Sequence, residues 1–217
     1  MGRRAALLVL AVFGIAATPA AHAQDVARGQ QLFALCSRCH SAQGQGAPLA
    51  LAPSIAGLDA WYVEAQLQKF RDGSRATHFD DLAGMRMRGM ARWLKTDDDV
   101  KAVAAYVSSL PKTRPESLVK GGDPVRGAAL YATCAGCHGA NAEGVQAVGA
   151  PAMNHTSDWY LETQLKNYKQ GIRGSDPRDV TGVAMRSMSI MLADDQAIKD
   201  VLAHITALGA SAGTGSE

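Results

Sequence analysis

Two copies of the pattern Cys-x-x-Cys-His constrain this chain more than any other feature of its sequence. They begin at Cys36 and Cys134, and together they contain all four cysteines of the 217 residues. Each copy places two thiols about one helical turn apart, so both can add to the vinyl groups of one porphyrin while the following histidine binds its iron. The sequence therefore predicts two covalently bound haem c groups. The predicted attachment residues are Cys36, Cys39, Cys134 and Cys137, and the predicted proximal iron ligands are His40 and His138.

Two other uses of such cysteines are less consistent with the pattern. A thioredoxin-like dithiol requires a strand before the motif and does not require the histidine. A zinc site needs two further ligands paired in space with each motif. Because the two motifs together contain all four cysteines, none is left for a structural disulfide.

The chain is a duplication. Shifting it by 98 positions, which carries Cys36 onto Cys134, superposes the halves without a gap from Arg28 to Leu110. Shared residues outside the motif include tryptophan, tyrosine, glutamine, arginine and methionine. They are Trp61-Tyr62 with Trp159-Tyr160, Gln66 with Gln164, Arg75 with Arg173, and Met87 and Met90 with Met185 and Met188. A repeat this long is a whole domain rather than a solenoid unit.

The order of segments follows from this repeat and from the N-terminus. Arg3 and Arg4 precede an apolar run that ends in Ala21-His22-Ala23, which is typical of a secretory signal peptide cleaved after Ala23. Its 13 apolar residues, from Ala5 to Ala17, are too few to span a bilayer, which takes about 20; the alternative of an uncleaved anchor is therefore disfavoured. We predict a signal peptide at 1–23, domains at 24–112 and 123–210, a linker at 113–122 and a flexible tail at 211–217.

Periodicity predicts an all-α fold with about three main helices in each domain. Asp25 and Asp123 are candidate N-caps of the helices that run into the two motifs. Apolar residues recur at helical spacing in a second helix and in a final helix that follows Thr96 or Ala193. A domain of fewer than 100 residues with few aromatics has a thin core, which a buried haem would complete.

Methionine is the sixth ligand that both halves offer. The histidines outside the signal and the motifs (His78, His155 and His204) have no histidine at the equivalent position of the other half. Two methionine pairs are shared, Met87 with Met185 and Met90 with Met188, and spacing alone does not choose between them. A packing role for all four is the remaining alternative.

These motifs resemble the dihaem class I cytochromes of the cytochrome c4 family over nearly all of the mature chain. The resemblance rests on Cys36-Ser-Arg-Cys39-His40, on Pro53-Ser-Ile-Ala-Gly57 and on Met87-Arg-Gly-Met90-Ala-Arg-Trp-Leu94. It implies two tandem class I cytochrome c-like domains, with Met87 and Met185 as the axial ligands. It also implies that the carbonyls of Pro53 and Pro151 accept a hydrogen bond from the proximal histidines.

The second half departs from the pattern at three positions, where His155, Ser187 and His204 replace Gly57, Gly89 and Tyr106. In the resembled family a glycine and an aromatic residue of the first helix pack on an aromatic residue of the last. The residues at those positions are Gly29, Phe33 and Tyr106 in the first half and Gly127, Tyr131 and His204 in the second. The departures predict looser packing, or a polar group near the second haem.

The predicted function is electron transfer rather than catalysis. His/Met ligation fills both axial positions and raises the reduction potential, which suits a periplasmic carrier between a respiratory donor and a terminal oxidase or reductase. Expected partners are redox proteins such as a membrane cytochrome complex, a terminal oxidase or a dehydrogenase. The halves of the mature chain carry formal charges of +3 and −3, too little to indicate nucleic acid.

Three questions about this function stay open. An alternative to a free carrier is that the chain is the electron-accepting subunit of a dehydrogenase complex. A dihaem peroxidase or a thiosulfate-oxidising enzyme is a weaker alternative, because a peroxidase needs unlike sites and the sulfur enzymes often use a spare cysteine. The arginines Arg75, Arg86, Arg88 and Arg92 are candidates for a docking face or for binding haem propionates, with an ordinary solvated surface as the alternative.

Overall fold

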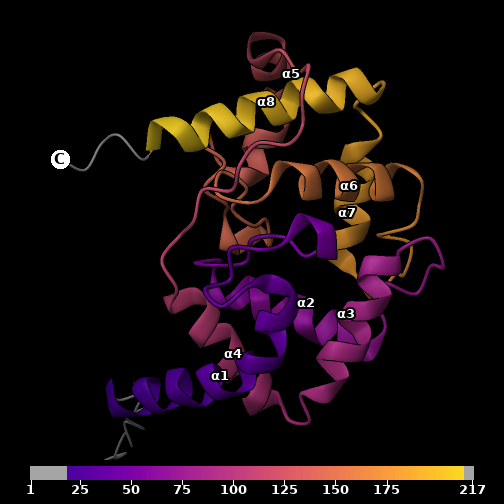
Figure 1. Ribbon diagram of the computed structural model, residues 1–217. Coiled ribbons are helices and arrows are strands. Elements are labelled where there is room, and N and C mark those ends of the chain that lie inside the picture. The colour runs from indigo at the N-terminus through magenta and orange to yellow at the C-terminus, as the bar shows by residue number, and fades with distance from the viewer. Residues whose placement is uncertain (1–18, 213–217) are drawn as a thin grey trace, which may run out of the picture.

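The computed structural model describes residues 19–212, and helices build both halves of that range (Figure 1). The first half contains α1 (Pro19–His40), α2 (Ala60–Asp72), α3 (Leu82–Trp93) and α4 (Asp97–Ser109). The second contains α5 (Pro124–His138), α6 (Asp158–Lys169), α7 (Val180–Ser189) and α8 (Asp195–Ala212). Short 3-10 turns lie at Pro48–Ala50 and Gln146–Val148, and within residues 19–212 there are isolated bridges but no strand. The all-α, two-domain fold is confirmed.

Each domain has one helix more than the three main helices expected, because the methionine segment is itself helical. Asp81 caps α3 and Asp179 caps α7, and each carboxylate accepts a hydrogen bond from the backbone N–H three residues on, at 2.9 Å. That third residue is Gly84 or Gly182, whose missing side chain leaves room for the carboxylate. The repeated Asp-x-x-Gly is thus the helix-start signal that sequence reasoning missed.

The two predicted N-caps of the motif helices have different outcomes. Asp123 caps α5 as expected, accepting hydrogen bonds from the N–H groups of Val125 and Arg126. The prediction for Asp25 was wrong in this chain, because α1 already begins at Pro19 and Asp25 lies inside it. Helix α1 therefore crosses the predicted cleavage point after Ala23, while residues 1–18 of the predicted signal lie outside the described residues. Most of the predicted 211–217 tail lies outside them too.

The first and last helices of each domain cross at a glycine. A Cβ added at Gly29 would overlap the carbonyl group of Ala102 in α4, and one at Gly127 would overlap that of Asp200 in α8. Beside these crossings, the Phe33 and Tyr106 rings lie 5.2 Å apart with their planes at 57°. The rings of Tyr131 and His204 lie 5.3 Å apart at 52°.

The similar ring distances and angles correct the expectation that the second domain packs more loosely. Its helices cross as closely as those of the first, because the imidazole of His204 takes the place of the phenol of Tyr106. The apolar residues that recur at helical spacing form the core, as predicted. Leu67 and Phe70 of α2 are buried, and so is the inner face of α4. The fully buried residues of α8, including Ile198 and Leu202, form the matching stripe.

The domains stack so that α2, α3, α6 and α7 lie between the outer helices α1 and α4 of one domain and α5 and α8 of the other (Figure 1). Their connection runs along one side of both domains and is anchored by Asp158, which accepts hydrogen bonds from Ser117, Leu118 and Val119. In the part of the chain that the structure describes, no helix is both long enough and apolar enough to cross a membrane.

Candidate haem sites

Each motif histidine is held with one ring nitrogen free. Nδ1 of His40 lies 2.9 Å from the carbonyl oxygen of Pro53, and Nδ1 of His138 lies 2.9 Å from that of Pro151. A carbonyl only accepts, so Nδ1 carries the proton and donates it, which leaves the lone pair of Nε2 available to a metal. Burial lowers the pKa of both imidazoles and so favours this neutral form. The contact expected from the resemblance is thus present in both domains.

The four motif cysteines have matching environments in the two domains. Cys36 and Cys134 are half-buried against the apolar cores, whereas Cys39 and Cys137 are exposed and no disulfide joins them. Burial raises the pKa of the Cys36 thiol to about 11 and raises that of Cys134, so neither is a ready thiolate. Within residues 19–212 no group of three or more histidine, cysteine or acidic side chains is arranged to hold a metal ion.

The structure distinguishes the two methionine pairs by exposure. Met87 is half-buried and packs against the same core as Cys36, and Met185 is half-buried at the equivalent turn of α7. Met90 and Met188 are 40% and 37% exposed, on the outer side of their helices. These positions favour Met87 and Met185 as the sixth ligands.

A hollow of about 490 Å³ opens on the first domain between residue 51 and the first half of α3. It is lined by Leu51, Leu82, Met85 and Arg86. Leu51 lies two residues before Pro53, the partner of His40, so the hollow lies between the proximal loop and the methionine helix. All four lining residues are exposed, so the hollow is an open depression of the surface.

Between the domains, two arginines form a crossed and nearly symmetric network. Arg75 donates to Gln66 of its own domain at 2.6 Å and to Tyr160 and Gln164 of the other at 3.0 and 3.1 Å. Arg173 mirrors it, donating to Gln164 at 2.7 Å and to Gln66 at 3.1 Å, with Tyr62 as its further partner. The repeat had shown that these residues are shared, but not that the two copies meet there.

Both guanidinium groups are incompletely satisfied, which tests whether a haem fits. Nε of Arg75 and Nε of Arg173 are buried without a hydrogen-bond partner, and among the described residues no salt bridge joins either group to a carboxylate. A buried cation without a paired anion is costly; Asp179 gives Arg173 only a longer-range attraction, and a haem would bring two propionate carboxylates. The residues therefore fit a haem in each domain, with Arg75 and Arg173 as candidate propionate partners.

The four arginines predicted for a docking face or for binding the propionates lie in different environments. Arg75 is buried between the domains, so the docking role was wrong for this residue. Arg86 and Arg92 are exposed, and Arg92 donates to the carbonyl of Arg71. Arg88 is half-buried and donates to the carbonyl of Ala76 at 3.4 Å.

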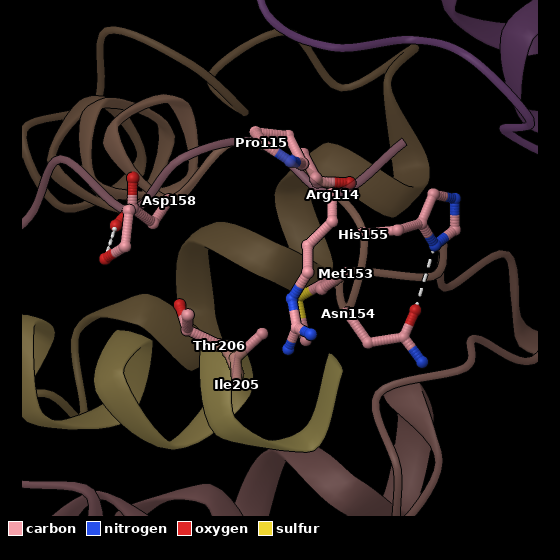
Figure 2. A pocket seen from close by; sticks show the side chains of 10 residues that line it. Arg114, Pro115, Met153, Asn154, His155, Asp158, Ile205 and Thr206 are labelled. Carbon is pink, nitrogen blue, oxygen red and sulfur yellow. Dashed lines mark hydrogen bonds between the residues drawn. The ribbon is translucent and has the colours of Figure 1, made fainter. Parts of the chain in front are cut away.

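His155, the residue that replaces Gly57, lies at the junction between the domains. Its Nδ1 is 2.9 Å from Oδ1 of Asn154, and its ring points away from Ile205 and Thr206 of α8 (Figure 2). Nε2 is buried without a hydrogen-bond partner. Burial and, next, the positive charge of Lys112 lower the pKa of this histidine. Ser187, the third departure, is exposed on α7.

Comparisons with known proteins agree with this geometry. The sequence profile of the cytochrome c family matches twice, over residues 26–111 and 124–209. A thiosulfate dehydrogenase electron acceptor from Stutzerimonas stutzeri is 31% identical over 213 residues, which cover 88% of this chain and 93% of that protein. A cytochrome c4 from Azotobacter vinelandii is 30% identical, covering 91% and 92%. The crystal structure of reduced cytochrome c4 from Pseudomonas stutzeri matches with a TM-score of 0.64 and 28% identity, covering 83% of this chain and 96% of that one.

Proposed function

This chain belongs to the cytochrome c family as a dihaem electron carrier, and from that premise we propose that His40 with Met87 and His138 with Met185 hold its two irons. The observation that carries the proposal is the repeated pair of a half-buried methionine and a histidine whose Nδ1 is bound to a proline carbonyl. The haems supply a reversible one-electron couple of iron. The carrier is proposed to pass single electrons between a respiratory donor and a terminal oxidase or reductase.

The protein residues have distinct parts in this function. The proline carbonyls fix the ring orientation of each histidine and keep its proton on Nδ1. Reduced and oxidised iron would therefore both bind the same atom, Nε2. The thioether of methionine is a weak, soft ligand that favours reduced iron. A histidine and a methionine on each iron would leave no position for oxygen or peroxide, which supports a carrier over a peroxidase.

The proposed location is the periplasm. The support is the sequence of residues 1–23, with its basic start, apolar run and small-x-small end. We propose cleavage after Ala23, folded domains at 24–112 and 123–210 with a linker at 113–122, and a tail at 211–217. N-terminal sequencing of the exported protein tests the first of these limits.

The ligand assignment is tested by the far-red sulfur-to-iron absorption band of the oxidised protein. Met87→Ala should remove about half of this band, because one of two methionine-bound irons loses its sulfur. Met90→Ala is the matched control and should leave the band intact. A band that survives Met87→Ala but halves in Met90→Ala would refute the assignment, and rapid peroxide turnover by the unmodified protein would refute the carrier.

A second role is favoured by a relative, the thiosulfate dehydrogenase electron acceptor of Stutzerimonas stutzeri. We propose that a thiosulfate dehydrogenase is an electron donor for the present chain. Thiosulfate should reduce the protein only when such a dehydrogenase is added. Reduction by thiosulfate alone would indicate an enzyme, and no reduction with the dehydrogenase present would exclude this donor.

A further inference from the structure

One lysine makes the contact between the domains unequal. Lys69, in the last turn of α2, extends into the second domain, where its Nζ lies 2.6 Å from Oδ1 of Asp179 and 2.6 Å from Oγ1 of Thr181. The side chain of Asp179 is 1% exposed and that of Lys69 is 18% exposed. The ion pair is therefore largely removed from water, where its strength is little reduced by salt.

The mirror-image contact is missing. In the repeat, Asn167 stands at the position of Lys69 and Ala83 at that of Thr181, whereas Asp81 matches Asp179. Asp81 is buried and caps α3 as Asp179 caps α7. Asn167 is also buried, yet in the described part of the chain its side chain makes no hydrogen bond to Asp81. The first domain thus holds the start of α7, while the second domain does not hold the start of α3.

Asp179 connects this contact to the second haem site. Its Oδ1 accepts hydrogen bonds both from Gly182 N–H, at 2.9 Å, and from Lys69. Met185 follows the cap by six residues on the same helix. Because α7 is only 10 residues long, anchoring its first turn also restrains the backbone that carries Met185.

Without Lys69 the carboxylate of Asp179 would lose its paired cation while still buried, and only the longer-range attraction of Arg173 would remain. Its other oxygen, Oδ2, already lacks a partner. Breaking one side of a buried pair leaves the remaining charge poorly compensated, which is unfavourable. The first turn of α7 is where the chain can relieve that cost, by moving Asp179 toward water.

We propose that Lys69 is a positioning residue for Met185, by which the first domain anchors the methionine helix of the second. This inference rests on the proposed ligation by Met87 and Met185. It makes the two sites unequal in a definite direction: Met185 leaves its iron less readily than Met87, because α7 is anchored across the interface and α3 is not.

Displacement of methionine by imidazole measures this difference. The far-red band is followed after imidazole is mixed with the oxidised full-length mature protein. In a Met87→Ala background the remaining band reports Met185, and in a Met185→Ala background it reports Met87. Displacement of Met185 should be roughly tenfold slower, which corresponds to about 1.4 kcal/mol.

Lys69→Met should speed the displacement of Met185 by roughly the same factor and leave that of Met87 unchanged. Lys69→Arg, which keeps a cation, should retain at least part of the restraint. The pair Asn167→Lys with Ala83→Thr installs the missing contact and should slow the displacement of Met87. If the alanine backgrounds fold poorly, the same changes are read in the otherwise unaltered chain as two phases of equal amplitude.

Three results would overturn the inference: equal rates for the two methionines, no effect of Lys69→Met, or equal acceleration at both sites. The last would mean that Lys69 only holds the domains together. A chain with no far-red band at all would refute methionine ligation itself. A band that is present but indifferent to Lys69 would refute the positioning role alone.

Discussion

Replacing Gly29 by alanine should destabilise the first domain, although alanine is the better helix former. The added Cβ would lie 2.7 Å from the carbonyl carbon of Ala102 and 2.7 Å from Cβ of Tyr106. Ordinary carbon contacts are about 3.5–4.0 Å, so α1 and α4 must separate by roughly 1 Å. The obstruction is backbone on one side and, on the other, the Cβ of Tyr106, whose ring packs at 57° against that of Phe33, so it cannot rotate away.

The magnitude follows from two opposing terms. Overpacking costs about 1–3 kcal/mol, and an immovable backbone obstacle puts this site at or above the upper end. Alanine recovers about 1 kcal/mol of helix propensity. The net loss is about 2 kcal/mol, which lowers the midpoint by roughly 10 °C for a domain of this size.

Thermal unfolding followed by far-ultraviolet circular dichroism and by the Soret band measures this loss. Gly89→Ala is the matched control, because Gly89 lies in α3 with no atom within 4 Å of an added Cβ. That variant should be slightly more stable than the parent. The reasoning about the crossing fails if Gly29→Ala is as stable as Gly89→Ala.

Two further predictions concern buried charge. The lowered pKa of His155 means that the unfolded chain binds a proton more readily than the folded one, so stability should be full above about pH 6.5 and fall below it. His155→Gln should reduce that fall, as urea unfolding at pH 7.5 and pH 5 would show; an unchanged pH dependence would contradict it. Arg75→Gln removes a buried positive charge and should lower the midpoint potential of at least one haem in a redox titration. The exposed Arg28, paired with Asp99, is the control, and a similar shift in Arg28→Gln would refute a specific effect.

Most of the fold was predictable because it rests on local periodicity and on the repeat. The stripe of Leu67 and Phe70, and the start of α4 at Thr96, follow from spacing and capping that the sequence displays. The extra helix α3 was missed because its start depends on Asp81 with Gly84, a repeated Asp-x-x-Gly signal whose carboxylate fills the space beside the glycine.

The ligand choice shows where sequence reasoning stops. Met87 and Met90 are three residues apart on α3, and which of them faces the core depends on the phase of that helix in the fold. His204 was misjudged for a related reason, since a flat ring of either kind satisfies the contact with Tyr131. The contacts of Arg75 span 85 and 89 residues, and no local pattern indicates that two copies meet face to face.

The crossed contacts of Arg75 and Arg173 are isologous. Arg75 of the first half donates to Gln164 of the second, and its counterpart Arg173 donates to Gln66 of the first. This is the geometry of a twofold homodimer. In such a dimer any substitution at the interface occurs twice. Joining the copies in one chain removes that constraint, so each half can change alone, as the positions of Lys69 and Asn167 have done. A fused chain can thus hold two chemically alike centres in unlike settings, which no symmetric pair of identical subunits can do.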